Sequence, residues 1–118
     1  MAHENTPHDH SYYHPADLGK FAEVGEDVPE LFKKFMAWYN ACFEDGALSV
    51  REKALIALAV SHSVQCPYCI DAYTQESLEK GSNLDQMTEA IHVAAAIKGG
   101  AALVHGLQMR NVADKLSM

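Results

Sequence analysis

Apolar residues recur three and four positions apart along most of this 118-residue chain, and nowhere do apolar and polar residues alternate for long. The first spacing is typical of amphipathic helices, whereas a half-buried strand requires the second. Between Pro29 and Glu44 two apolar stripes run side by side: Leu31, Phe35, Trp38 and Cys42 form one, and Phe32, Met36, Tyr39 and Phe43 form the other. An apolar face that broad contacts more than one neighbour. The predicted fold class is therefore all-α.

Capping residues, prolines and glycines divide the chain into about six helices. Ser49 and Glu52 have the spacing of a capping box, and Pro29 and Pro67 suit a first helical turn. Either Ser82 or Asn83 caps a later helix. The expected helices cover residues 17–24, 29–44, 50–64, 67–80, 84–98 and 101–115. Gly99-Gly100 is expected to break the fifth helix or to permit close packing, and the all-apolar run 54–60 is expected to be buried on several sides.

Length and composition predict the domain organisation and exclude some classes of protein. We expect one domain over residues 12–118, preceded by a disordered, His-rich tail over residues 1–11 that is solvated or picks up a transition metal. The formal charge of −7 argues against nucleic-acid binding. The longest apolar run, 54–60, is far short of the roughly 20 residues that span a membrane. No secretory signal is apparent, so a cytoplasmic protein is predicted.

Cys66 and Cys69 form a Cys-Pro-Tyr-Cys motif at a predicted helix start. At this spacing two sulfurs approach bonding distance, and the N–H groups of a helix N-terminus stabilise a thiolate. These features favour a redox-active dithiol. Two other interpretations remain open: half of a zinc site completed by histidines or another subunit, and a pair of inert buried thiols. Cys42, on an apolar stripe, is expected to be a small buried side chain.

Four residues are candidates for moving the thiol protons: His62, Tyr73, His92 and His105. His62 lies four residues before Cys66, and Tyr73 lies four residues after Cys69 on the same helix face. An unperturbed histidine titrates near pH 6.5, which suits a base at neutral pH. His62 is therefore the first candidate and His92, on the next helix, the second. The nearby carboxylates of Glu52, Asp71 and Glu76 are more simply explained as solvated.

Two segments resemble a known family, and the likeness extends over the chain from Tyr12 onward. The segments are REKALIALAVSHSVQCPYCIDAYTQESLEKG and MTEAIHVAAAIKGGAALVHGLQMRN. They are similar to the alkylhydroperoxidase D and carboxymuconolactone decarboxylase family, and to its arsenosugar biosynthesis-associated, peroxidase-like subgroup. The resemblance implies an all-α helical bundle that assembles into homo-trimers or homo-hexamers.

The resemblance also implies an activity: a cofactor-free antioxidant peroxidase whose dithiol reduces a hydroperoxide. A dithiol partner, such as a lipoyl domain or a thioredoxin-like protein, then reduces the resulting disulfide. By the family pattern Cys69 attacks the peroxide and Cys66 resolves the sulfenic acid. Decarboxylase members of the fold lack the dithiol, which favours the redox function for this chain.

The chain departs from the family pattern at two positions of the proton relay. A Glu is expected twelve residues before the first Cys, where this chain has Ala54, and a His four residues after the second Cys, where it has Tyr73. Alanine accepts no proton, and tyrosine, with an ordinary pKa near 10, is a poor base at pH 7. We therefore expect His62 or His92 to replace the relay, or the peroxidase activity to be weak. The alternatives to a peroxidase are a thiolate-binding protein for trivalent arsenic or zinc, and a structural oligomer with a vestigial dithiol.

Overall fold

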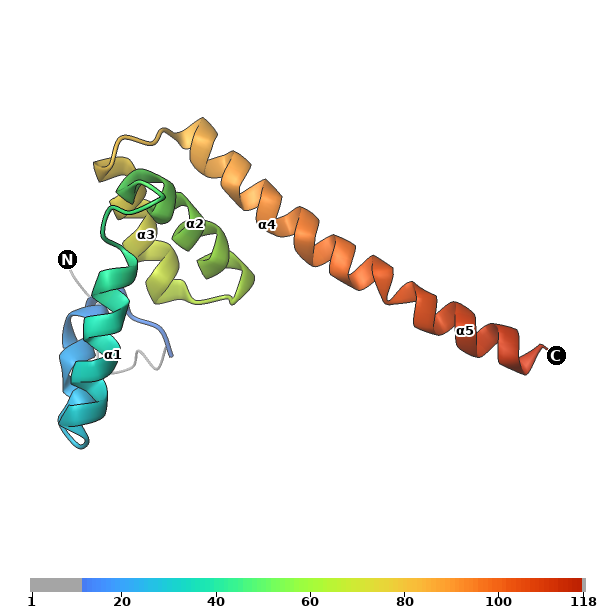
Figure 1. Cartoon of the computed structure of the whole chain (residues 1–118), viewed down its shortest axis with the longest axis horizontal. Coiled ribbons are helices and arrows are strands. Elements are labelled where there is room, and N and C mark those ends of the chain that lie inside the picture. The colour runs from blue at the N-terminus through green and yellow to red at the C-terminus, as the bar shows by residue number, and fades with distance from the viewer. Residues whose placement is uncertain (1–11, 118) are drawn as a thin grey trace, which may run out of the picture. The chain divides into compact units, whose positions relative to one another are not determined.

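A computed structural model describes residues 12–117, and all of its regular elements are helical (Figure 1). The prediction of an all-α fold of about six helices is confirmed, because five α-helices and one 3₁₀-helix cover this range. The chain divides after Glu44 into two compact units. The tail expected over residues 1–11 lies outside the described residues.

The first unit holds the 3₁₀-helix η1 (Pro15–Gly25) and the helix α1 (Pro29–Cys42). The rings of Phe21 and Phe32 meet edge to face with centroids 5.4 Å apart, which joins the two elements. A side chain at Gly25 would collide with the ring of Phe32, so glycine permits this close approach. The short helix expected over residues 17–24 is thus present, in the tighter 3₁₀ form.

The apolar stripe on α1 is not buried within the single chain, which corrects the expectation for Cys42. Cys42 is exposed, and the neighbouring side chain of Trp38 is 65% exposed. Helical spacing showed that the two lie on one face but could not show what covers that face.

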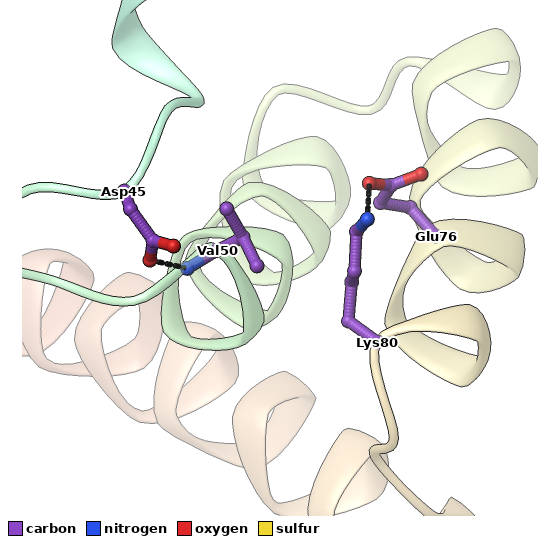
Figure 2. Close-up of polar contacts among 4 residues, drawn as sticks. All are labelled: Asp45, Val50, Glu76 and Lys80. Carbon is purple, nitrogen blue, oxygen red and sulfur yellow. Dashed lines mark hydrogen bonds and ion pairs between the residues drawn. The ribbon is translucent and has the colours of Figure 1, made fainter.

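The second unit holds the helices α2 (Val50–Ser63), α3 (Pro67–Glu79), α4 (Leu84–Val104) and α5 (Gly106–Leu116). The capping box of Ser49 and Glu52 is confirmed, and Asp45 Oδ1 accepts a further hydrogen bond, at 3.1 Å, from the N–H of Val50 (Figure 2). Of the two candidate caps for α4, Asn83 is the one used, in a second capping box with Gln86.

Helix α2 contacts both α3 and α4 (Figure 1). Its buried positions follow one stripe at helical spacing: Ala54, Leu58 and Ser61. Ser77 on α3 and Met87 and Ala94 on α4 are also buried. The run 54–60 was expected to be buried on several sides, but Ile56 and Val60 are exposed within the single chain. Only one face of α2 belongs to the core.

The expected break at Gly99-Gly100 is wrong, because α4 continues through both glycines to Val104. A methyl group at either glycine would meet no other atom within 4 Å, so neither marks close packing within the chain. A glycine costs an exposed helix about 1 kcal/mol, which a long helix tolerates. The turn lies instead at His105, and α4 and α5 run on from one another as a rod (Figure 1).

By length and composition, residues 84–116 are apolar enough to cross a membrane, which the sequence analysis did not recognise. The most apolar window has a mean hydropathy of 1.4, and 6% of it is buried. One such helix is weak evidence for a membrane span, because core helices of soluble proteins pass the same test. What the helix does establish is a long apolar surface that the single chain leaves uncovered.

Candidate active site

The motif lies where α2 ends and α3 begins. The N–H of Cys66 donates to the carbonyl of Ser61 at 3.1 Å, and the N–H of Gln65 donates to the carbonyl of His62 at 3.2 Å. These two bonds are those of a Schellman motif, in which the residue after the helix adopts the left-handed conformation. That residue is Gln65, with φ of 57°. The turn therefore sets the position of Cys66 relative to the end of α2.

A lysine from α4 caps the C-terminus of α2. Lys98 Nζ donates to the carbonyl of Ser63, in the last turn of α2, at 3.0 Å. Terminal carbonyls of a helix have no partner within the helix, and a lysine both bonds them and offsets their partial negative charge. Lys98 thus fastens α4 to the backbone three residues before Cys66. Sequence spacing gives no sign of this contact, because 35 residues separate the two partners.

Cys66 is the N-cap of α3, and its sulfur accepts the hydrogen bond that a Ser or Asp side-chain oxygen usually accepts at this position. The N–H of Cys69 donates to Cys66 Sγ at 3.3 Å. Pro67 follows at the first helical position, where its missing N–H costs no hydrogen bond. The predicted placement of the pair at a helix start is therefore confirmed. No disulfide joins the two sulfurs, and both side chains are half-buried.

The two thiols have different surroundings. Burial, together with the hydrogen bond and charge of Cys66, raises the pKa of the Cys69 thiol to about 11, while a hydrogen bond with Ser61 partly opposes the shift. In the reduced state Cys69 is accordingly a neutral thiol at pH 7.

Ser61 is a site residue that the sequence analysis missed. It is 4% exposed, its hydroxyl donates to the carbonyl of Ala57 at 2.6 Å, and its backbone carbonyl binds Cys66. A signal was present in the sequence: Ser61 continues the stripe of Ala54 and Leu58 toward the motif. A polar residue in line with a buried stripe, five positions before a reactive cysteine, is a candidate partner for it.

His62, the first candidate proton acceptor, has a defined ring orientation. His62 Nδ1 lies 2.8 Å from the carbonyl of Leu58, and because a carbonyl only accepts, this nitrogen carries the proton. Nε2 is therefore the ring nitrogen that is left to accept a proton, one turn before the motif. His92 is exposed on α4, and so is His105 at the turn to α5. Tyr73 lies half-buried on α3. The role of each remains a prediction.

The carboxylates set aside earlier have other partners. Glu52 closes its capping box, Asp71 accepts from Gln75 Nε2 at 3.3 Å, and Glu76 pairs with Lys80 at 3.8 Å (Figure 2). Residues 12–117 contain no group of three or more His, Cys, Asp or Glu side chains placed to hold one metal ion. Within this region a zinc site would have only the two sulfurs of the motif.

Comparison with known proteins gives consistent matches. Residues 29–109 match the model of the carboxymuconolactone decarboxylase family. A protein described as uncharacterized protein 4 in the cox locus of Paracoccus denitrificans is 38% identical over 101 residues, which cover 86% of this chain and 88% of that protein. An uncharacterized protein from Cupriavidus necator is 24% identical over 98 residues, covering 83% of this chain and 87% of that protein.

Two crystal structures resemble the fold. One, of a protein from Methanobacterium thermoautotrophicum, has a TM-score of 0.68 and 34% identity, over 71% of this chain and 94% of that one. The other is the apo form of a carboxymuconolactone decarboxylase family protein from Legionella pneumophila. Its TM-score is 0.64 at 29% identity, over 76% of this chain and 80% of that one.

Proposed function

This chain belongs to the carboxymuconolactone decarboxylase family, and on that premise we propose that it is a thiol-dependent peroxidase or disulfide oxidoreductase working through Cys66 and Cys69. The observation that carries the proposal is the hydrogen bond from the N–H of Cys69 to Cys66 Sγ. Both free thiols therefore lie at the N-terminal end of α3, where backbone N–H groups stabilise a sulfur anion.

The proposed reaction consumes two thiols and one hydroperoxide and yields one disulfide, one alcohol and one water. A dithiol partner, a lipoyl domain or a thioredoxin-like protein, then restores the two thiols by exchange and leaves with the disulfide. The cycle needs neither a metal nor an organic cofactor. The cycle fits the cytoplasmic location predicted from the sequence, because thiols there are kept reduced.

A peroxide-consumption assay with different donors tests this function. Hydroperoxide loss is followed with dithiothreitol, dihydrolipoamide or reduced thioredoxin, for the wild type and for Cys66→Ser, Cys69→Ser and Cys42→Ser. We expect turnover in the wild type and in the Cys42 variant, and none above background in the other two. Equal rates in all four proteins would refute the proposal.

The likeness to the arsenosugar-associated subgroup gives the same experiment a second arm. Two thiols at this spacing also suit trivalent arsenic, which is a soft, thiolate-seeking ion. Mass spectrometry after incubation with arsenite measures the adduct. A stoichiometric adduct at Cys66 and Cys69, without any peroxide turnover, would replace the peroxidase by an arsenic-binding function.

A further inference from the structure

The two sulfurs of the motif occupy different positions on α3. Cys66 is the N-cap, and its Sγ accepts the N–H of Cys69 at 3.3 Å. A negative charge on this sulfur is stabilised by that N–H and by the positive end of the helix. Cys69 lies in the first turn, and its own N–H donates its hydrogen bond to Cys66 Sγ. The helix terminus therefore favours an anion at Cys66.

The surroundings of Cys69 favour the neutral thiol. Burial is the main cause, and an anion on Cys66 adds repulsion. Ala54, on the buried face of α2, accepts no proton. The ring nitrogen Nδ1 of His62 donates its hydrogen bond to the carbonyl of Leu58 and not to a sulfur.

On the premise of the proposed dithiol chemistry, we infer that Cys66 is the sulfur that attacks the hydroperoxide and that Cys69 is the resolving thiol. These roles are the reverse of those that the family likeness implies. The N-cap hydrogen bond at Cys66 Sγ and the placement of Cys69 within the first turn carry the inference. Lys98 and the Schellman turn hold Cys66 in this position from the α2 side.

The chemistry proceeds in two balanced steps. The thiolate of Cys66 attacks the terminal oxygen of the hydroperoxide, the O–O bond breaks, and the leaving alkoxide takes a proton to become an alcohol. Cys66 is then a sulfenic acid. The thiol of Cys69 gives up its proton as its sulfur attacks Cys66 Sγ, and the S–O bond breaks with release of water. The two sulfurs end as a disulfide, so both electrons come from the dithiol.

Trapping the sulfenic acid identifies the attacking sulfur. Two full-length variants are made in a Cys42→Ser background, which removes the third thiol: Cys69→Ser keeps Cys66, and Cys66→Ser keeps Cys69. Each is treated with cumene hydroperoxide in the presence of dimedone, and the adduct is mapped by mass spectrometry. The Cys42→Ser protein itself, treated with peroxide alone, reports whether the disulfide forms.

We expect dimedone to label Cys66 in the first variant at least about tenfold faster than Cys69 in the second. Faster labelling of Cys69 would overturn the inference and leave the proposed function intact. Labelling of neither sulfur, with disulfide formation in the Cys42→Ser protein, also contradicts the inference. A sulfenic acid at Cys66 has no resolving thiol in the Cys69→Ser variant and should therefore remain to be trapped. If the Cys42→Ser protein keeps both thiols, the proposed function itself fails.

Discussion

The N–H of Cys66 donates to the carbonyl of Ser61 at 3.1 Å, and through this one bond the end of α2 determines where α3 begins. Cys66 is at once the third residue beyond α2 and the N-cap of α3. Only Val64 and Gln65 separate the last residue of α2 from Cys66. The position of the dithiol therefore depends on the packing of α2 and on the turn at Gln65.

Replacing Gln65 by glycine is expected to stabilise the protein. Gln65 has φ of 57°, a left-handed conformation that costs an ordinary residue about 1–2 kcal/mol. Glycine removes that strain but loses about 0.5–1 kcal/mol to chain entropy. The net gain for Gln65→Gly is up to about 1.5 kcal/mol in the free energy of unfolding, measured by urea denaturation. Gln65→Ala, which keeps the strain, serves as the control and should show no gain. A destabilised glycine variant would contradict this account of the turn.

Removing the Lys98 ammonium is expected to loosen the helix end before Cys66. Lys98→Met leaves the carbonyl of Ser63 to water and should lower the free energy of unfolding by about 0.5–1 kcal/mol, a modest cost because the contact is exposed. Lys98→Arg keeps a donor and should retain most of the stability. Lys115→Met, on exposed α5, controls for the loss of charge. Equal stability of the Met, Arg and wild-type proteins at position 98 would show that the contact contributes nothing.

The reactivity of Cys69 is expected to rise with pH far above neutrality. With its pKa raised to about 11 by burial, only about 10⁻⁴ of the molecules carry the thiolate at pH 7. The initial alkylation rate at Cys69, followed by peptide mass mapping of the reduced wild type, should increase about tenfold per pH unit up to about pH 10. A plateau below pH 8.5 would show that the thiol is more acidic than its surroundings indicate.

The same raised pKa has a consequence for stability. Between the ordinary pKa of 9.0 and about 11, the folded protein holds the Cys69 proton while the unfolded chain has lost it. The contribution to the free energy of unfolding is therefore complete below pH 9 and is lost as pH rises toward 11. Under reducing conditions Cys69→Ser should lose less stability over this range than the wild type. Cys42→Ser is the matched control and should follow the wild type.

The sequence predicted those parts of the fold that depend on neighbouring residues. The capping box follows from the spacing of Ser49 and Glu52. The start of α3, and with it the helix-terminal position of the dithiol, follows from the preference of proline for the first helical position. The left-handed turn at Gln65 gave no such signal, because the residue at that position is usually glycine, whereas the helix end near residue 64 was predicted. The continuation of α4 through Gly99 was missed because glycine weakens a helix without ending it.

Other parts of the site depend on contacts between distant segments. Lys98 reaches the end of α2 from α4, and no local spacing encodes that contact. The expected burial of Cys42 failed for a related reason. A stripe on one helix shows which residues share a face, whereas burial requires a second surface to cover it. A single chain does not supply that surface for every apolar stripe here.

The uncovered apolar surface of α4 and α5 leads to the last prediction, a homo-oligomer. Val93, Ile97, Leu103 and Val104 are all exposed within the single chain, and Ile97 is 70% exposed. A contiguous apolar surface of this kind is unusual on a soluble monomer and marks an interface. Light scattering at micromolar concentration should therefore give a mass of a trimer or hexamer, and a monomer would contradict the prediction.

A charge on this surface should separate association from folding. Ile97→Asp desolvates a carboxylate if position 97 is covered by another copy, so we expect at least about a tenfold loss of oligomer affinity. The helical circular dichroism of the dissociated chain should stay close to that of the wild type, because Ile97 contributes little to the core of its own chain. Gln108→Glu, on exposed α5, adds a similar charge at a polar position and should leave the mass unchanged. If Ile97→Asp keeps the full oligomer mass, the interface lies on another face.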